Sequence, residues 1–408
     1  MTNEHTTQKE FIFLVALLTA MVAMSIDTML PAIGTIASEF GVADPNDRQY
    51  IIGFFFGGMT IGTLLYGPIS DSTGRKPAIF AGLLFYLAGT LLCLFSTSFE
   101  MMLAGRALQG FGASSPRVVS MAMVRDGQSG AAMARIMSFV MMVFMLVPIL
   151  APSIGQLVLY VASWRMIFAG LLVMAVIAAI FLEVRQEETL PKERRAPFSA
   201  GELLGAAREF FRFPIAWGYT IAVGCVFASF ISYLGTSQQI FAEQYAQGDL
   251  FAVWFGAFAV AIAIAMMVNA KLVMRYGMRT LSKWALRFHI MASTLFLIVA
   301  MLQAGHPPLW TLGIYLFFTF FCSGILFGNY NAMAMEPVGR IAGMAAAISG
   351  SLSSLVALGV GSWIGQQYDG TILPLLYGFL AMGLSALAFS EWAEFAKTKE
   401  VNNPRLAE

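Results

Sequence analysis

The chain has 408 residues, of which 58% are hydrophobic and only 12% are charged. A soluble globular protein carries roughly 25% charged residues, so the composition excludes an ordinary water-facing surface. The net charge of +1 gives no basis for binding nucleic acid. Cys93, Cys225 and Cys322 lie singly in apolar stretches, without the spacing of a metal or disulfide site. The composition therefore predicts a chain embedded in a lipid bilayer.

Twelve apolar stretches are long enough to cross a membrane as helices, which takes about 20 residues each. The first is too long for the core of a signal peptide, so we expect it to remain as a span. The expected spans are residues 11–38, 49–70, 78–96, 99–122, 131–158, 163–183, 214–240, 251–274, 280–303, 309–335, 341–366 and 372–393. The predicted fold class is an all-α integral membrane protein with twelve transmembrane helices.

The basic residues test this arrangement. If the N-terminus is cytoplasmic, only Arg48 and Arg165 fall in outer loops. Arg106 and Arg117 lie within one span, and the other Lys and Arg residues fall on the cytoplasmic side. This asymmetry is what the positive-inside rule requires. Both termini are therefore expected in the cytoplasm.

A polar stretch at residues 184–213 is the expected divide between two halves. Ser199 and Glu202 have the spacing of a capping box, and an amphipathic run follows them. We expect residues 1–183 to form a first six-helix half and residues 184–213 a cytoplasmic linker with an amphipathic helix. Residues 214–408 then form the second half with a short cytoplasmic tail.

The strongest single motif lies between the second and third spans, where residues 67–76 read GPISDSTGRK. It resembles the GxxxDxxGRK loop of the major facilitator superfamily. Gly67 would allow close helix approach. Asp71 could accept hydrogen bonds from helix N-terminal amides or pair with an arginine. Gly74 is the turn glycine, and Arg75 and Lys76 would hold the loop in the cytoplasm; the alternative is a plain positive-inside turn.

A weak second copy of this loop follows the eighth span. Gly277 stands half a chain after Gly74, with Arg275 and Arg279 beside it, and Met274 occupies the place of Asp71. Parallel six-helix repeats produce such a pattern in transporters. A charge-based gate is therefore expected to be asymmetric between the halves.

Two charges deep in the spans are the main functional candidates, because ionisable groups are costly there. Asp27 lies well inside the first span, and Arg106 in the fourth span is placed at a similar depth. The hypothesis is that they pair, with Asp27 binding and releasing a proton; the alternative is a static pair that only fixes helix packing. For Arg117, snorkelling to the cytoplasm is favoured. For His289, a packing role is favoured over a proton relay.

Further motifs identify a family resemblance. The fourth span contains Arg106-Ala-Leu-Gln109-Gly-Phe-Gly-Ala, and the fifth contains Pro148, Pro152 and Gly155, with Ala151 where the usual pattern has glycine. The prolines are expected to bend the fifth helix, either as a simple kink or to shape contact between the halves. Together with the segments at residues 27–31, 125–126 and 164–165, these resemble the Bcr/CflA group of drug/proton antiporters. That resemblance implies a major facilitator fold, alternating access, proton-driven export and a location in the bacterial inner membrane.

The leading functional hypothesis is proton-coupled efflux of small amphipathic compounds or drugs by antiport; the alternative is a symporter that imports a small nutrient or metabolite. The expected partners are a small-molecule substrate, protons and the bilayer, with a monomer as the working unit. No cofactor or metal site is expected. The sequence lacks HExxH, GxSxG and Walker A motifs, so an enzyme is not expected. Candidate cavity residues, expected between the halves near the bilayer midplane, are Gln109, Tyr233, Gln238, Gln239, Asn329, Tyr330 and Asn331. For those in the second half, the alternative is helix packing or solvation at the outer end of a span.

Overall fold

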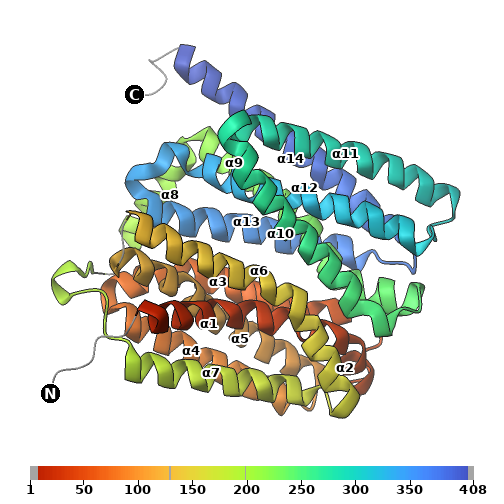
Figure 1. Ribbon diagram of the computed structural model, residues 1–408, viewed down its shortest axis with the longest axis horizontal. Helices are drawn as coiled ribbons and strands as arrows, with labels where there is room; N and C mark the ends of the chain where they lie inside the picture. The colour runs from red at the N-terminus through yellow and green to blue at the C-terminus, as the bar shows by residue number, and fades with distance from the viewer. Residues whose placement is uncertain (1–7, 128–129, 198, 403–408) are drawn as a thin grey trace. The chain divides into compact units, whose positions relative to one another are not determined.

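The computed structural model describes residues 8–127, 130–197 and 199–402, and these ranges are helical with no strand. The chain divides into two compact units, residues 1–199 and 200–408. Figure 1 shows the helices of each unit. The first unit contains α1 (Gln8–Asp27), α2 (Ile33–Glu39), α3 (Tyr50–Thr73), α4 (Arg75–Leu94), α5 (Phe99–Gly127), α6 (Gly130–Val161) and α7 (Arg165–Arg185).

The second unit begins with the short amphipathic helix α8 (Ala200–Arg212), where the sequence predicts one. It continues with α9 (Pro214–Gln238), α10 (Phe251–Tyr276), α11 (Met278–Leu302), α12 (Leu309–Met335), α13 (Ala342–Gln366) and α14 (Leu373–Asn402). A π-helical turn, Gln239–Gln244, extends α9. A 3-10 segment, Glu336–Ile341, joins α12 to α13.

Ten stretches of the described chain are long and apolar enough to cross a membrane. One of them runs from Leu309 to Gln366 and so covers both α12 and α13. The helix α5 is not among the ten, because its polar and charged residues, Arg106 and Arg117 included, lower its hydropathy. The all-helical membrane fold predicted from hydropathy is confirmed.

Small residues bring α5 against both of its neighbours. A Cβ atom at Gly110 would lie 1.9 Å from the carbonyl oxygen of Phe55 in α3. A Cβ atom at Gly112 would lie 2.2 Å from the backbone nitrogen of Tyr86 in α4. Only glycine permits such close backbone contact between helices in a membrane. The polar residues of α5 are therefore held tightly between α3 and α4.

Candidate functional site

The first span is interrupted at Asp27. The helix α1 ends at this residue, a 3-10 turn covers Leu30–Ala32, and α2 begins at Ile33. Pro31 explains the position of the break. Proline has no N–H, and an uninterrupted helix would need that N–H to bond the Asp27 carbonyl. The continuous helix predicted over residues 11–38 is therefore wrong in its middle, and Asp27, which is 5% exposed, lies at a helix end inside the membrane.

The proline-containing helix α6 packs directly on this break. A Cβ atom at Gly155 would lie 1.9 Å from the carbonyl oxygen of Thr28, so only glycine fits there. Pro148 and Pro152 precede it in the same helix, which runs through both. The sequence predicts a bend from these prolines; the structure adds that the glycine after them lies beside the residue that follows Asp27.

Arg106 is fully buried and donates to three acceptors. Its Nε binds the Ile51 carbonyl at 3.2 Å, and its Nη1 binds the Ser25 carbonyl at 3.0 Å and Gln109 Oε1 at 2.5 Å. The guanidinium lies 4.4 Å from the centre of the Phe55 ring. In the part of the chain that the structure describes, Nη2 has no hydrogen-bond partner. Arg106 therefore joins α5 to α1 and α3 through backbone carbonyls.

Three residues without a role in the sequence motifs complete this network. Ser25 Oγ and the Tyr86 hydroxyl are 2.6 Å apart. Gln109 Nε2 donates to Thr90 Oγ1 at 2.9 Å, and Gln109 is fully buried. Since both ends of its amide are engaged, Gln109 is not a cavity-lining residue in this structure, which corrects that expectation. Small hydroxyl residues carry little sequence signal, and only the tertiary contacts identify them.

The direct pair predicted between Asp27 and Arg106 is also wrong in this structure. Among the described residues, the guanidinium of Arg106 is bonded to Ser25, Ile51 and Gln109 instead. The reason is the helical rotation. Residues 25 and 27 point about 200° apart around α1, so the face that meets α4 and α5 is not the face that carries Asp27. Similar depth along two helices does not imply that two side chains meet.

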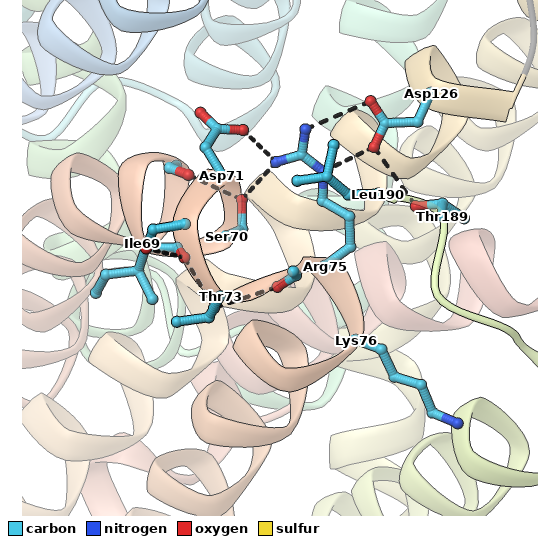
Figure 2. Close-up of polar contacts among 12 residues, drawn as sticks. Ile69, Ser70, Asp71, Thr73, Arg75, Lys76, Asp126, Thr189 and Leu190 are labelled. Atoms are coloured by element: carbon cyan, nitrogen blue, oxygen red, sulfur yellow. Dashed lines mark hydrogen bonds and ion pairs between the residues drawn. The ribbon is translucent and has the colours of Figure 1, made fainter. Parts of the chain in front are cut away.

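The loop between α3 and α4 is held by Arg75, as Figure 2 shows. Its Nη1 pairs with Asp71 and donates to Ser70 Oγ at 2.8 Å, and its Nε donates to Asp126 at 2.7 Å. Asp126 ends the cytoplasmic turn of α5, so a single guanidinium ties that helix to the loop. Asp71 pairs within its own loop, and the structure supplies Asp126 as a second carboxylate that the loop motif does not contain.

The segment after α7 also contacts this loop. The Glu188 carboxylate accepts from the backbone N–H groups of Arg75 and Lys76 at 2.9 and 3.0 Å, which caps the N-terminus of α4. Lys76 Nζ lies 3.1 Å from a carboxylate oxygen of Glu183. The first part of the predicted linker, residues 184–213, therefore binds the loop between α3 and α4. The sequence does not indicate the role of Glu188 in this contact.

The role predicted for Gly67 is wrong. A Cβ atom at this position would have nothing within 4 Å, so Gly67 does not mediate close helix approach in this structure. That role falls to Gly58 and Gly62 of the same helix. A Cβ atom at Gly58 would lie 1.9 Å from the Ala107 oxygen of α5, and one at Gly62 would lie 2.0 Å from Ser114 Oγ, both far inside van der Waals contact.

The candidate cavity residues of the second unit are mostly engaged inside it. Asn329 exchanges two hydrogen bonds with Asn269, at 2.9 and 3.0 Å. Tyr233 is 1% exposed and packs against Phe320, with ring centres 4.8 Å apart. Gln239 and Tyr330 are also buried. These four are corrected to packing positions, because neighbouring helices cover them; Gln238 is half-buried, and Asn331 is exposed.

His289 lies between helices of the second unit. It is 5% exposed, its Nε2 lies 3.4 Å from the Phe379 carbonyl oxygen of α14, and a Cβ atom at Gly383 would touch its ring. His289 is therefore packed between α11 and α14, and among the described residues its Nδ1 has no hydrogen-bond partner.

Comparison with known proteins agrees with this architecture. The sequence model of the Major Facilitator Superfamily matches residues 15–362. The bicyclomycin resistance protein homolog of Haemophilus influenzae is 28% identical over 398 residues, which cover 95% of this chain and 97% of that protein. The multidrug resistance protein MdtL of Salmonella heidelberg is 31% identical over 191 residues, 46% of this chain and 47% of that protein.

Solved structures support the fold independently. A bacterial homolog of the human lysosomal transporter Spinster, in an inward-facing and occupied conformation, aligns with a TM-score of 0.72 at 12% identity. The alignment covers 97% of this chain and 98% of that chain. The family match over most of the sequence, the twelve-helix plan and the drug-resistance relatives together show that the chain belongs to the Major Facilitator Superfamily, with relatives of the Bcr/CflA type, and is a multi-pass membrane transporter rather than an enzyme.

Proposed function

We propose that this transporter exports small amphipathic compounds from the bacterial cytoplasm across the inner membrane in exchange for protons, by alternating access. The relatives named for bicyclomycin resistance and multidrug resistance support the direction and the class of compound. The observation that carries proton coupling is Asp27, a buried carboxyl at the break between α1 and α2. A carboxyl group inside a span is costly unless it has a task.

Asp27 would bind a proton from the outer side and release it to the cytoplasm. Arg106 is a positioning residue in this scheme, because it holds the Ser25 carbonyl at 3.0 Å and so fixes the last turn of α1 before Asp27. Gly155 holds the other side of the break through its contact with Thr28. A shift of α6 against α1 would therefore move the segment that carries Asp27, and that coupling supports a conformational cycle linked to its protonation.

Inverted membrane vesicles provide the test, because their lumen corresponds to the outer side of the cell. Acidifying the lumen should drive uptake of a fluorescent amphipathic drug by the wild-type chain, since each drug molecule enters as protons leave. We expect Asp27→Asn to reduce this uptake to background while the variant remains inserted. Asp44→Asn, the same change at an exposed outer position, is the matched control and should keep wild-type uptake.

Two outcomes contradict the proposal. Full gradient-driven uptake by Asp27→Asn would exclude this carboxyl from coupling. Uptake only into right-side-out vesicles, driven by an acidic exterior, would favour the importing symporter. Asp27→Glu keeps the carboxyl and separates a loss of coupling from a loss of folding, because it should retain part of the transport if the proton is what matters.

A further inference from the structure

Arg117 is a cation within a span of the first unit that the proposed proton cycle does not use. It lies in α5, four residues past the middle of the helix, and its side chain is exposed. The one contact that the structure gives it is to a thioether, from its Nη1 to Met59 Sδ at 3.8 Å. In the described part of the chain it forms no ion pair. An arginine inside a span without a carboxylate is expensive.

Several cations in or near the spans differ from Arg117 in this respect. Arg75 pairs with Asp71 and Asp126, and Arg165 pairs with Glu39 at 2.6 Å. In the second unit, three cations near helix ends have carboxylates: Arg279 with Glu336 and Glu394, Lys283 with Glu391, and Arg340 with Glu209. Arg106 has its own carbonyl acceptors. Arg117 alone among these carries a positive charge with neither a carboxylate nor a carbonyl in contact.

The direction of the side chain argues against the snorkelling favoured from the sequence. The chain of α5 runs toward the cytoplasm, and side chains lean toward the N-terminus of their helix. Gly62 of α3 packs against Phe111 and Ser114, which places Met59 at a level about one to two turns farther from the cytoplasm than the Cα of Arg117. Since Nη1 contacts Met59, the guanidinium points toward the middle of the membrane.

The cytoplasmic surface is also out of reach. Asp126 marks that surface, because it binds the loop arginine Arg75. It stands nine residues after Arg117, which corresponds to about 13 Å along the helix. This distance exceeds the reach of an arginine side chain, and the side chain points the other way. Arg117 is therefore held at membrane depth and directed away from the cytoplasmic surface.

We propose that Arg117 binds an anionic group of the transported compound, so that the substrates include amphipathic organic anions such as aromatic carboxylates and sulfonates. A guanidinium offers paired N–H donors that match a carboxylate or a sulfonate. The neighbouring Met59 provides a polarizable apolar contact for an aromatic ring. This inference rests on the proposed transport function and specifies its substrate class.

Binding to the purified full-length protein tests the inference without any proton gradient. The probes are 2-naphthoate and 2-naphthalenesulfonate, with 2-naphthamide as the neutral analogue of the same shape. The affinity is read from the shift in the thermal midpoint with probe concentration. We expect Arg117→Gln to weaken binding of both anions by about tenfold to hundredfold, the range for hydrogen bonds to charged groups, and to leave 2-naphthamide unchanged. Arg117→Lys should be intermediate.

Arg135→Gln is the control for charge, because Arg135 is an exposed arginine near the start of α6; it should bind all three probes as the wild type does. The inference is overturned if the wild type binds neither anion more tightly than Arg117→Gln, or if that variant loses the amide as strongly as the anions. Failure of proton-driven uptake with intact anion binding would instead reject the proposed transport cycle and keep the site.

Discussion

The loop between α3 and α4 and the loop between α10 and α11, which each join the second and third spans of a unit, have the same backbone and different charges. Gly74 has φ 107° and ψ 160°, and Gly277 has φ 78° and ψ 156°. Both values lie in a region that is almost restricted to glycine. Each glycine also closes its preceding helix, with N–H bonds to the carbonyls of Ser70 and Val273 at 3.1 and 2.9 Å. The backbone repeat predicted from weak sequence similarity is real.

The acidic partners are supplied differently. In the first unit, one carboxylate comes from the loop itself and one from α5. In the second unit, Met274 stands where Asp71 would, and Arg279 takes both carboxylates from other helices. Its Nη2 lies 2.6 Å from Glu336 at the end of α12, and its Nε lies 2.8 Å from Glu394 of α14. The second loop lacks the aspartate, yet its arginine still binds two carboxylates; we call each such arginine with its two carboxylates an arginine clamp.

In both units an arginine at the loop joins helix ends through two carboxylates, although the carboxylates come from different positions in the sequence. In both units one carboxylate lies at the end of the fourth span: Asp126 in the last turn of α5, and Glu336 directly after α12. The two clamps differ in exposure, since the side chain of Arg75 is 8% exposed and that of Arg279 is 33% exposed. The first clamp should therefore contribute more to stability, because water screens it less.

The largest difference between the loops should appear at the glycines. Alanine at either position is strained by about 1–3 kcal/mol. At Gly74 the added Cβ would also lie 2.5 Å from the Glu188 carboxylate, whereas at Gly277 it would meet nothing within 4 Å. Displacing Glu188 from the start of α4 removes charge-assisted hydrogen bonds worth about 1.5–3 kcal/mol. We expect Gly74→Ala to lower the thermal midpoint of the purified protein clearly more than Gly277→Ala.

Gly127→Ala is a useful reference, because a Cβ there would also have nothing within 4 Å and Gly127 has the helical backbone of the last turn of α5. It should leave the midpoint close to that of the wild type. Equal midpoints for Gly74→Ala and Gly277→Ala would mean that the Glu188 cap contributes nothing measurable.

The arginines come next in expected effect. Arg75→Gln leaves the Asp126 and Asp71 carboxylates without their guanidinium, and we expect a loss of on the order of 2 kcal/mol, below the about 3–5 kcal/mol of a fully buried pair. Arg279→Gln breaks a more exposed cluster and should cost about 1 kcal/mol or less. Midpoints measured at low and at high salt distinguish the two, because salt weakens exposed pairs more. A larger loss for Arg279→Gln would reverse the ranking of the clamps.

The smallest effect should follow from restoring the missing aspartate. Met274 is 88% exposed, and Arg279 already has two carboxylates. Met274→Asp should therefore change stability by no more than about 0.5 kcal/mol, as an ordinary surface substitution does. Adding Met278→Arg recreates the i, i+4 spacing of Asp71 and Arg75 and should recover a few tenths of a kcal/mol. A strong change in either variant would show that the second loop has contacts beyond this cluster.

Much of the fold was predictable from the order of apolar and basic residues along the chain. Apolar length placed the spans to within a few residues in most cases, and the basic residues indicated their direction. The prediction failed inside the first span, because Pro31 breaks the helix without interrupting its hydropathy. It also understated α14, which continues to Asn402 beyond the apolar segment expected to end at residue 393.

The sequence was sufficient to predict which residues belong to the candidate site, but not which residues they contact. Asp27, Arg106 and Arg75 were identified from charge and motif alone. Their partners were not, because a side chain meets another only if its helix is rotated toward it. Thus Arg106 binds carbonyl groups rather than Asp27, and the glycine expected to allow close helix approach, Gly67, has open space beside it.

The sequence by itself determined the all-helical membrane fold and the charges that lie within its spans, and it predicted the direction of those spans, since each depends only on composition along the chain and on the cost of placing charge in lipid. Tertiary structure decided which acid holds each arginine, which glycine abuts the break at Asp27 and which way Arg117 points. Those features depend on helix rotation and on neighbours far apart in sequence, so they become defined only when the helices pack.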